Sequence, residues 1–198
     1  MVRYGLSVLA LVGLMGCAAD QIWAPEEELT KAFYAHPGPK YITLYTMKNV
    51  GSGNGAHTSL LINASQRVMW DPSGSFAHPQ LPERNDLIFG MSPSALNVFV
   101  DYHSRAEFFT VARTIEVPAD VAEDLMRRAM QNGAVMNAFC TASTVGLLQD
   151  TPGFEGLRSS FFPDNLDAQF SKIPGVVTEE FRDNDPDKET ALERHVTF

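Results

Sequence analysis

The amino-acid sequence predicts an α+β fold in which helices pack on an antiparallel sheet. Two observations support this prediction. One is the order in which helical and strand-like segments follow one another along the chain. The other is a tight turn, residues 64–66, that joins two strand-like segments and so favours antiparallel pairing. After removal of a targeting segment, the chain has about the length of one domain and enough apolar residues for an ordinary core.

Strand-like segments show β-branched and aromatic residues with alternating polarity. Residues 108–117 have this composition most clearly. In the segment that begins at His57, the period of two places His57 and Ser59 on one side and Leu60 on the other, toward a core. The predicted strands are residues 41–47, 57–63, 67–71, 86–89, 108–117 and 176–181.

Helical segments show apolar residues at helical spacing together with start and stop residues. The clearest helix follows Pro118, with Val121, Leu125 and Ala129 on one face, and it ends at Asn132-Gly133. The predicted helices are residues 25–34, which Pro25 opens, 93–103, 118–130, a segment around Cys140 that stops at 151–153, and a short helix within 163–173.

The first residues are predicted to be a targeting segment. Arg3 supplies a positive charge, and residues 6–15 form an apolar stretch that is too short to span a membrane. The stretch ends in Leu14-Met-Gly-Cys17, which resembles the bacterial lipobox, although Met15 stands where Ala or Ser is usual. Cys17 would then be lipidated and become the first residue. The alternative is a plain secretory signal with an incidental cysteine.

The chain divides into four parts on these grounds. Residues 1–17 are the predicted lipoprotein signal peptide, 18–24 a tether, 25–182 a single folded domain, and 183–198 a charged, solvated tail. Ala18 follows the cysteine, and by the enterobacterial sorting habit the absence of Asp there suggests the outer membrane, with the protein facing the periplasm. A three-chain anchor would hold the protein firmly at the membrane.

Composition and motifs argue against several functions. The chain has 24 acidic and 15 basic residues, a net charge of −9 and no basic cluster, so nucleic-acid binding is not expected. The glycine-rich loop 49–55 precedes a strand and lacks the Gly-Lys-Ser/Thr ending of a phosphate loop. Asp101 stands near His103, but one such pair is not a metal site, and no metal or cofactor is expected. The serines lack a Gly-x-Ser-x-Gly elbow.

Cys140 is the only cysteine left once Cys17 is acylated. An unpaired cysteine in an exported protein is either buried and inert or kept for its reactivity, and this fact alone leaves both open. Asn137 is a favoured N-cap residue; if it caps, Ala138, Phe139 and Cys140 occupy the first helical turn. The unpaired N–H groups and the dipole there stabilise a thiolate. The polar neighbours of Cys140 weaken the alternative of a small core residue.

His57 and Asp71 are the other candidate catalytic residues. They lie fourteen residues apart, on two strands joined by a tight turn, which can bring such positions side by side. A carboxylate at Asp71 could accept a hydrogen bond from the imidazole of His57 and fix its tautomer. The alternatives are that His57 is a structural residue and that Asp71 caps the turn of residues 71–74.

The order His57, Asp71, Cys140 resembles the circularly permuted branch of the papain-like, NlpC-type superfamily. Members of that branch place a strand histidine first, a polar residue on the next strand, and the cysteine on a later helix. Residues 55–75 and 137–148 bear the likeness. Asp71 replaces the histidine often found as third residue, and Asn is not directly before Cys140 as in the retinol acyltransferase group, so retinoid or phospholipid acyl transfer is not carried over.

The resemblance implies a periplasmic, membrane-anchored thiol hydrolase in which Cys140 is the nucleophile, His57 the acid and base, and Asp71 the orienting residue. The implied substrates are amides, either cell-wall peptides, including those of peptidoglycan, or amide-linked acyl groups. Two alternatives remain open at this point. One is a non-catalytic envelope lipoprotein that binds peptidoglycan fragments or a protein partner. The other is a thiol acyltransferase, in which a nucleophile other than water resolves the thioester.

Overall fold

A computed structural model describes residue 19 and residues 21–198. The predicted signal peptide, its lipobox with Cys17, and residues 18 and 20 of the tether lie outside this part. Within the described residues, no helix has both the length and the apolar character needed to cross a membrane.

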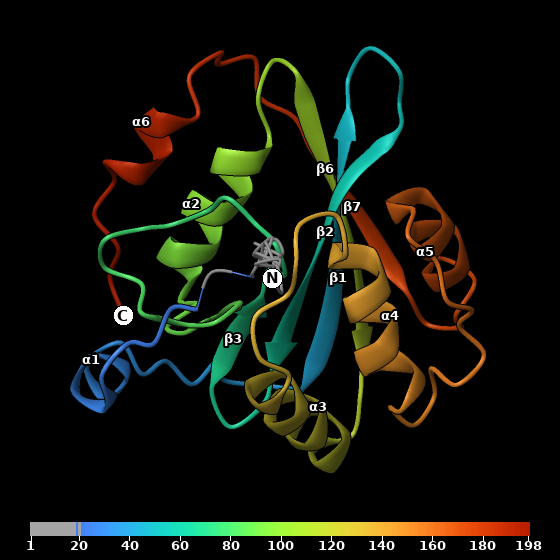
Figure 1. Ribbon diagram of the computed structural model, residues 1–198, viewed down its shortest axis with the longest axis horizontal. Coiled ribbons are helices and arrows are strands. Elements are labelled where there is room, and N and C mark those ends of the chain that lie inside the picture. Colours follow the sequence, from blue (N-terminus) through green and yellow to red (C-terminus); the bar gives the residue numbers. More distant parts are fainter. Residues whose placement is uncertain (1–18, 20) are drawn as a thin grey trace, which may run out of the picture.

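The described residues confirm the α+β class with an antiparallel sheet (Figure 1). The sheet has the strand order β4-β5-β3-β2-β1-β6-β7, and each pair of neighbours is antiparallel. Its strands are β1 (Tyr41–Asn49), β2 (Gly55–Asn63), β3 (Arg67–Trp70), β4 (Glu83–Arg84), β5 (Leu87–Ile88), β6 (Phe108–Glu116) and β7 (Val177–Phe181). The helices are α1 (Glu26–Lys31), α2 (Pro93–His103), α3 (Ala119–Gln131), α4 (Cys140–Gln149), α5 (Pro163–Phe170) and α6 (Glu189–Leu192).

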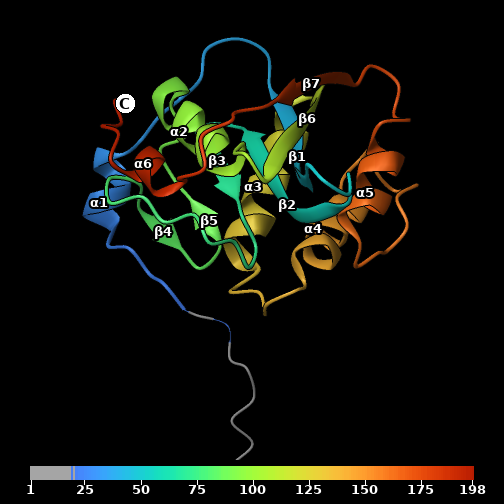
Figure 2. The same cartoon turned by 90° about the horizontal axis from the view of Figure 1, so that it is seen from above.

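Helices cover both faces of the sheet, and each face has its own core. Apolar residues of α3, α4 and α5 pack on one face, where Leu60 and Ile62 of β2 are fully buried. Residues of α2 and α6 pack on the other, where Leu61 is buried. Figure 2 shows the two groups of helices on either side of the strands. Because both faces are covered, β2 reads as an apolar run over residues 60–62 instead of a clean alternation.

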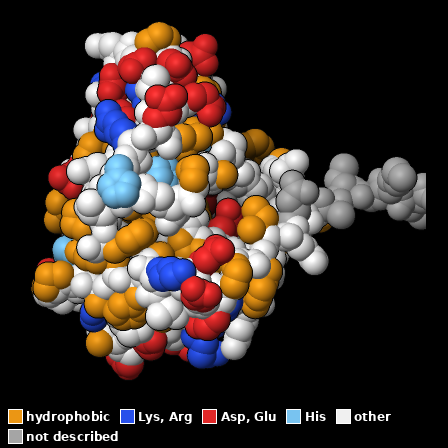
Figure 3. Space-filling model, turned by 90° about the vertical axis from the view of Figure 1, so that its left-hand side faces the viewer, with side chains coloured by type: hydrophobic (Ala, Val, Ile, Leu, Met, Phe, Trp, Pro, Cys, Tyr) orange, Lys and Arg blue, Asp and Glu red, His pale blue; other side chains and the backbone are white. Residues whose placement is uncertain are grey.

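The C-terminal segment, residues 183–198, differs from the solvated tail expected from its charges. Ala191 and Val196 are buried at 0% and 1% exposure in the core beneath α2. The side chain of Ser92 donates to the carbonyl of Thr197, and Arg194 pairs with Asp101 of α2 at 3.0 Å. Two apolar side chains and a few polar anchors therefore hold this segment on the domain, although most of its charged side chains remain exposed (Figure 3).

The first half of β2 is free of a strand neighbour on one side, and this opening forms the site. Strand β3 pairs only with residues 60–63 of β2, and helices α4 and α5 lie beside the rest. The hydroxyls of Thr58 and Thr141 are 3.3 Å apart, and the N–H of Gly55 donates to Asp164 at 2.7 Å. A Cβ at position 55 would lie 2.7 Å from the Cβ of Pro163, so only glycine permits this close approach.

Candidate active site

The side chains of His57 and Asp71 are in direct contact. Nε2 of His57 donates to Oδ1 of Asp71 at 2.7 Å. The register of the two strands explains the contact. Leu60 of β2 pairs with Trp70 of β3, so Ser59 lies beside Asp71, the residue that follows β3. His57 lies on the same face of β2 as Ser59. The tight turn therefore brings the two residues together as the sequence predicts.

Asp71 is buried and held by several groups. Its side chain is 3% exposed, and the hydroxyl of Ser59 donates to the same oxygen that His57 contacts. Burial acts to raise the pKa of this carboxyl, but His57, with smaller contributions from His103 and Ser59, outweighs burial and keeps the pKa below its usual value. The carbonyl of Asp71 also accepts from the N–H of Gly74 at 3.0 Å, so the turn and the site coexist.

Helix α4 begins at Cys140, which places the cysteine at the first helical position. The prediction that Asn137 caps the helix was wrong, because the N-cap residue is Phe139 and no side chain caps it. Ala138 has a left-handed backbone with φ of 69°, which interrupts any helix that starts at Asn137. Ala138 and Phe139 therefore precede the first turn. The N–H groups of that turn have no intrahelical partner, so they remain available to bind an anion.

Cys140 and His57 shift each other's protonation. Burial alone would lower the pKa of His57, but the Asp71 carboxylate, together with a contribution from Cys140, raises it to about 10. Burial acts to raise the pKa of the Cys140 thiol, but His57, the Thr141 hydroxyl and the N–H of Thr58 lower it below the usual value. Nε2 of His57 is engaged by Asp71, so Nδ1 is the ring nitrogen free to serve the sulfur. The arrangement favours a thiolate beside an imidazolium.

His103 is a further member of the site that the sequence analysis considered only as a metal ligand. Its ring stacks on that of His57, with centroids 6.2 Å apart and planes 19° apart. Nδ1 donates to the carbonyl of Phe99 at 2.8 Å. Burial, with a smaller effect of charged His57, lowers the pKa of His103 to about 4, so the ring is neutral at ordinary pH. No local pattern signals this role, because it depends on how α2 packs on the sheet.

A pocket of about 400 Å³ adjoins His57. Its walls include Met47, Tyr102, His103, Phe108 and Lys188, the last from the C-terminal segment. Cys140 is 7% exposed and does not line it. The structure therefore gathers His57, Asp71 and Cys140 in one place, and of these three residues His57 lines the pocket.

Comparison of the chain with protein-family models, curated proteins and solved structures finds no match. Among the described residues, no group of three or more His, Cys, Asp and Glu side chains is placed to hold a metal ion.

Gly74→Ala is expected to weaken the His57–Asp71 contact. A Cβ at Gly74 would overlap Oδ2 and Cγ of Asp71, so the buried carboxylate must move. We expect a loss of about 1–3 kcal/mol in the free energy of unfolding and a rise in the pKa of Cys140, measured by urea denaturation and by the pH dependence of alkylation. Gly146→Ala is the matched control, because a Cβ there meets no atom within 4 Å. Equal behaviour of the two variants would contradict the prediction.

Proposed function

We propose that the protein is a thiol hydrolase that cleaves amide bonds, with Cys140 as nucleophile, His57 as acid and base, and Asp71 as positioning residue. The observation that carries the proposal is the 2.7 Å bond between His57 and buried Asp71, next to a cysteine whose pKa is lowered by the same imidazole. Inert core cysteines lack such a partner, since burial by itself raises a thiol pKa.

The proposed reaction has two halves. The Cys140 thiolate attacks the carbonyl carbon, and the N–H of Cys140 stabilises the oxyanion at the start of α4. Imidazolium His57 gives its proton to the leaving amine as the C–N bond breaks. Neutral His57 then takes a proton from water, which attacks the thioester, and the sulfur leaves as thiolate. If an acceptor other than water attacks, the same machinery performs acyl transfer.

Chain order supports a permuted papain-like fold as part of this proposal. The histidine is on β2, its carboxylate partner follows β3, and the cysteine begins the later helix α4. Papain-like enzymes that are not permuted place the cysteine helix first. The antiparallel sheet with α4 beside β2 supplies the strand and helix context that this arrangement needs.

The proposed setting is the periplasmic face of the outer membrane. A lipid on Cys17 would hold the domain there, within reach of cell-wall peptides, including peptidoglycan, and amide-linked acyl groups. The net charge of −9 is unfavourable for nucleic acid as a partner.

One observation favours a second candidate, a non-catalytic binding protein of the cell envelope. Cys140 is nearly buried and lies outside the wall of the pocket, so the pocket could hold a ligand without using the thiol. A binding protein has no need of a thiol with a lowered pKa.

The test uses the full chain with Cys17→Ser, in which Cys140 is the sole thiol. The protein is incubated with p-nitrophenyl acetate, and later with amino-acid p-nitroanilides, while release of the nitroaromatic group is followed. We expect turnover and an acetyl thioester on Cys140 by mass spectrometry, both absent in Cys140→Ala and reduced at least 100-fold in His57→Ala. Equal turnover in all three proteins would refute the mechanism.

A further inference from the structure

We infer that the pocket beside His57 binds a carboxylate-bearing part of the substrate, and that Lys188 determines this specificity. The inference rests on the proposed function and names the chemical class of its ligand, an amphipathic acyl or peptidyl group with a free carboxylate. It departs from the sequence analysis, in which Lys188 belongs to a solvated tail.

Lys188 is a cation without an anionic partner. Lys188 forms no ion pair with any residue that the structure describes. Its Nζ instead lies 5.0 Å from the centre of the Tyr102 ring, which forms part of the pocket wall. In a chain with a net charge of −9, an exposed ammonium that lies over an aromatic wall and has no ion pair among the described residues is well suited to attract an anion.

Arg105 belongs to the same wall, and its charge is balanced by two carboxylates. It is 6% exposed and pairs with Asp101 at 3.1 Å and Asp185 at 3.2 Å. Its Nε is buried without a hydrogen-bond partner in the described residues, so this guanidinium retains an unused donor. The pair with Asp185 also attaches the C-terminal segment near Lys188. Tertiary contacts therefore build this wall, and the exposed side chain of Lys188 lies at its surface.

The rest of the pocket suits the apolar part of such a ligand. Met47, Ala56, Phe108 and Pro186 give it apolar walls. Glu107 is the acidic residue among the lining residues, and it is exposed. We therefore expect Glu107 to oppose the anion weakly, because an exposed charge is screened by water and salt.

The pocket is linked to the nucleophile through His57 and Ser73. His57 belongs to the pocket wall and also shifts the pKa of Cys140. Ser73, also in the wall, donates to the carbonyls of Val135 at 3.2 Å and Met136 at 2.6 Å, in the loop that leads to Cys140. A ligand with its carboxylate at Lys188 would thus extend toward His57, where its amide would meet the catalytic residues.

The test compares alkylation of Cys140 by iodoacetate, an anion, and by iodoacetamide, its neutral analogue, in the full chain with Cys17→Ser. The quantity measured is the ratio of the two rate constants. Lys188→Gln is expected to lower this ratio about two- to fivefold and Lys188→Glu to lower it further, with the iodoacetamide rate unchanged. The difference should shrink near 1 M salt, where the screening length is about 3 Å.

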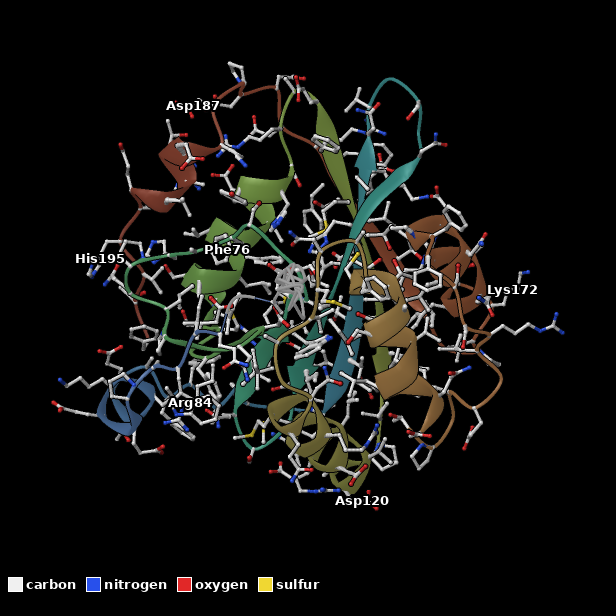
Figure 4. The ribbon with its side chains drawn as sticks, in the orientation of Figure 1. Phe76, Arg84, Asp120, Lys172, Asp187 and His195 are labelled. Carbon is white, nitrogen blue, oxygen red and sulfur yellow. The ribbon has the colours of Figure 1, made fainter. Side chains whose placement is uncertain are left out.

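Lys172→Gln is the matched control, because exposed Lys172 lies beyond α5, on the opposite side of the molecule from Asp187 and α6 (Figure 4). A ratio that is the same in wild type, Lys188→Gln and Lys172→Gln overturns the inference and leaves the proposed function standing. If Cys140 proves inert to both reagents, the proposed function fails. The charge preference is then decided by NMR titration with N-acetyl-leucine and its amide. A Met47 methyl shift for the carboxylate alone supports the inference, and equal shifts or none overturn it.

Discussion

Alkylation of Cys140 by iodoacetamide at pH 6 is expected to slow about tenfold or more when His57 is replaced by Gln, which corresponds to a rise of about one unit or more in the pKa of the thiol. In the wild type, the imidazole of His57, whose pKa is raised to about 10, lowers the pKa of the Cys140 thiol below its usual value and so favours the thiolate. Glutamine has similar volume but no charge. Without the charge of His57, the pKa of the thiol would return to about 8.5 or above, and a thiol with that pKa is less than about 1% ionised at pH 6. The measurement is the alkylation rate from pH 5 to 10 in the Cys17→Ser chain.

Two controls show whether this loss comes from the charge of His57. At pH 10 the rates of wild type and His57→Gln should approach each other, because both sulfurs are then largely ionised. His195→Gln removes an exposed imidazole at the outer edge of the C-terminal segment (Figure 4) and should match wild type throughout. A wild-type rate that titrates near 8.5 and is indifferent to His57→Gln would make Cys140 an ordinary core residue, and the binding protein would become the leading candidate.

Local patterns were enough to predict the strand half of the site. The alternation around His57 and the short turn after Asn63 fix which residues of β2 share a face, and the register then follows from the turn. The helix half was predicted only in part. An asparagine three residues before Cys140 is a favoured cap, but the left-handed Ala138 moves the helix start to Cys140 itself. A non-glycine residue in that conformation has no sequence signal.

Contacts between distant segments set the rest of the site, and these were beyond prediction from the sequence. His103 stacks on His57 because α2 packs on one face of the sheet. The sequence places His103 on a helix but does not say which strand residues that helix will contact. The C-terminal segment looks like a solvated tail because charged residues outnumber its apolar ones. Two buried side chains, Ala191 and Val196, are enough to dock it and to bring Lys188 to the pocket.

Replacing Cys140 by Ala is expected to change how the free energy of unfolding depends on pH. The raised pKa of His57 contributes stability that is fully present below pH 6.5 and is lost as pH rises toward about 10. The lowered pKa of Cys140 contributes stability that is present above the unfolded thiol value of about 8.5 and is lost as pH falls. Between pH 6.5 and 8.5 the unfolded pair binds one proton, and a folded pair that consists of thiolate and imidazolium also binds one, so such a pair adds no slope.

Cys140→Ala removes the second contribution and leaves the first, since Asp71 still raises the pKa of His57. The folded variant then binds one proton more than the unfolded chain, and its stability falls by up to about 1.4 kcal/mol per pH unit, or about 2 kcal/mol across the interval. Urea denaturation at pH 6.5, 7.5 and 8.5 measures this. Glu83, whose pKa burial and nearby carboxylates raise to about 7, titrates in both proteins, so the difference between them is the informative quantity.

The pattern among variants separates loss of the thiolate from loss of packing. Cys140→Ser keeps more of the side-chain volume but cannot ionise in this range, so its stability should fall with pH as in Cys140→Ala. Val145→Ala removes fully buried volume from the same helix and should lower stability by a similar amount at every pH. If Cys140→Ala instead runs parallel to wild type, the folded protein holds Cys140 as a neutral thiol. The imidazolium of His57 would then belong to Asp71 alone, an ion pair that stabilises the fold without preparing a nucleophile.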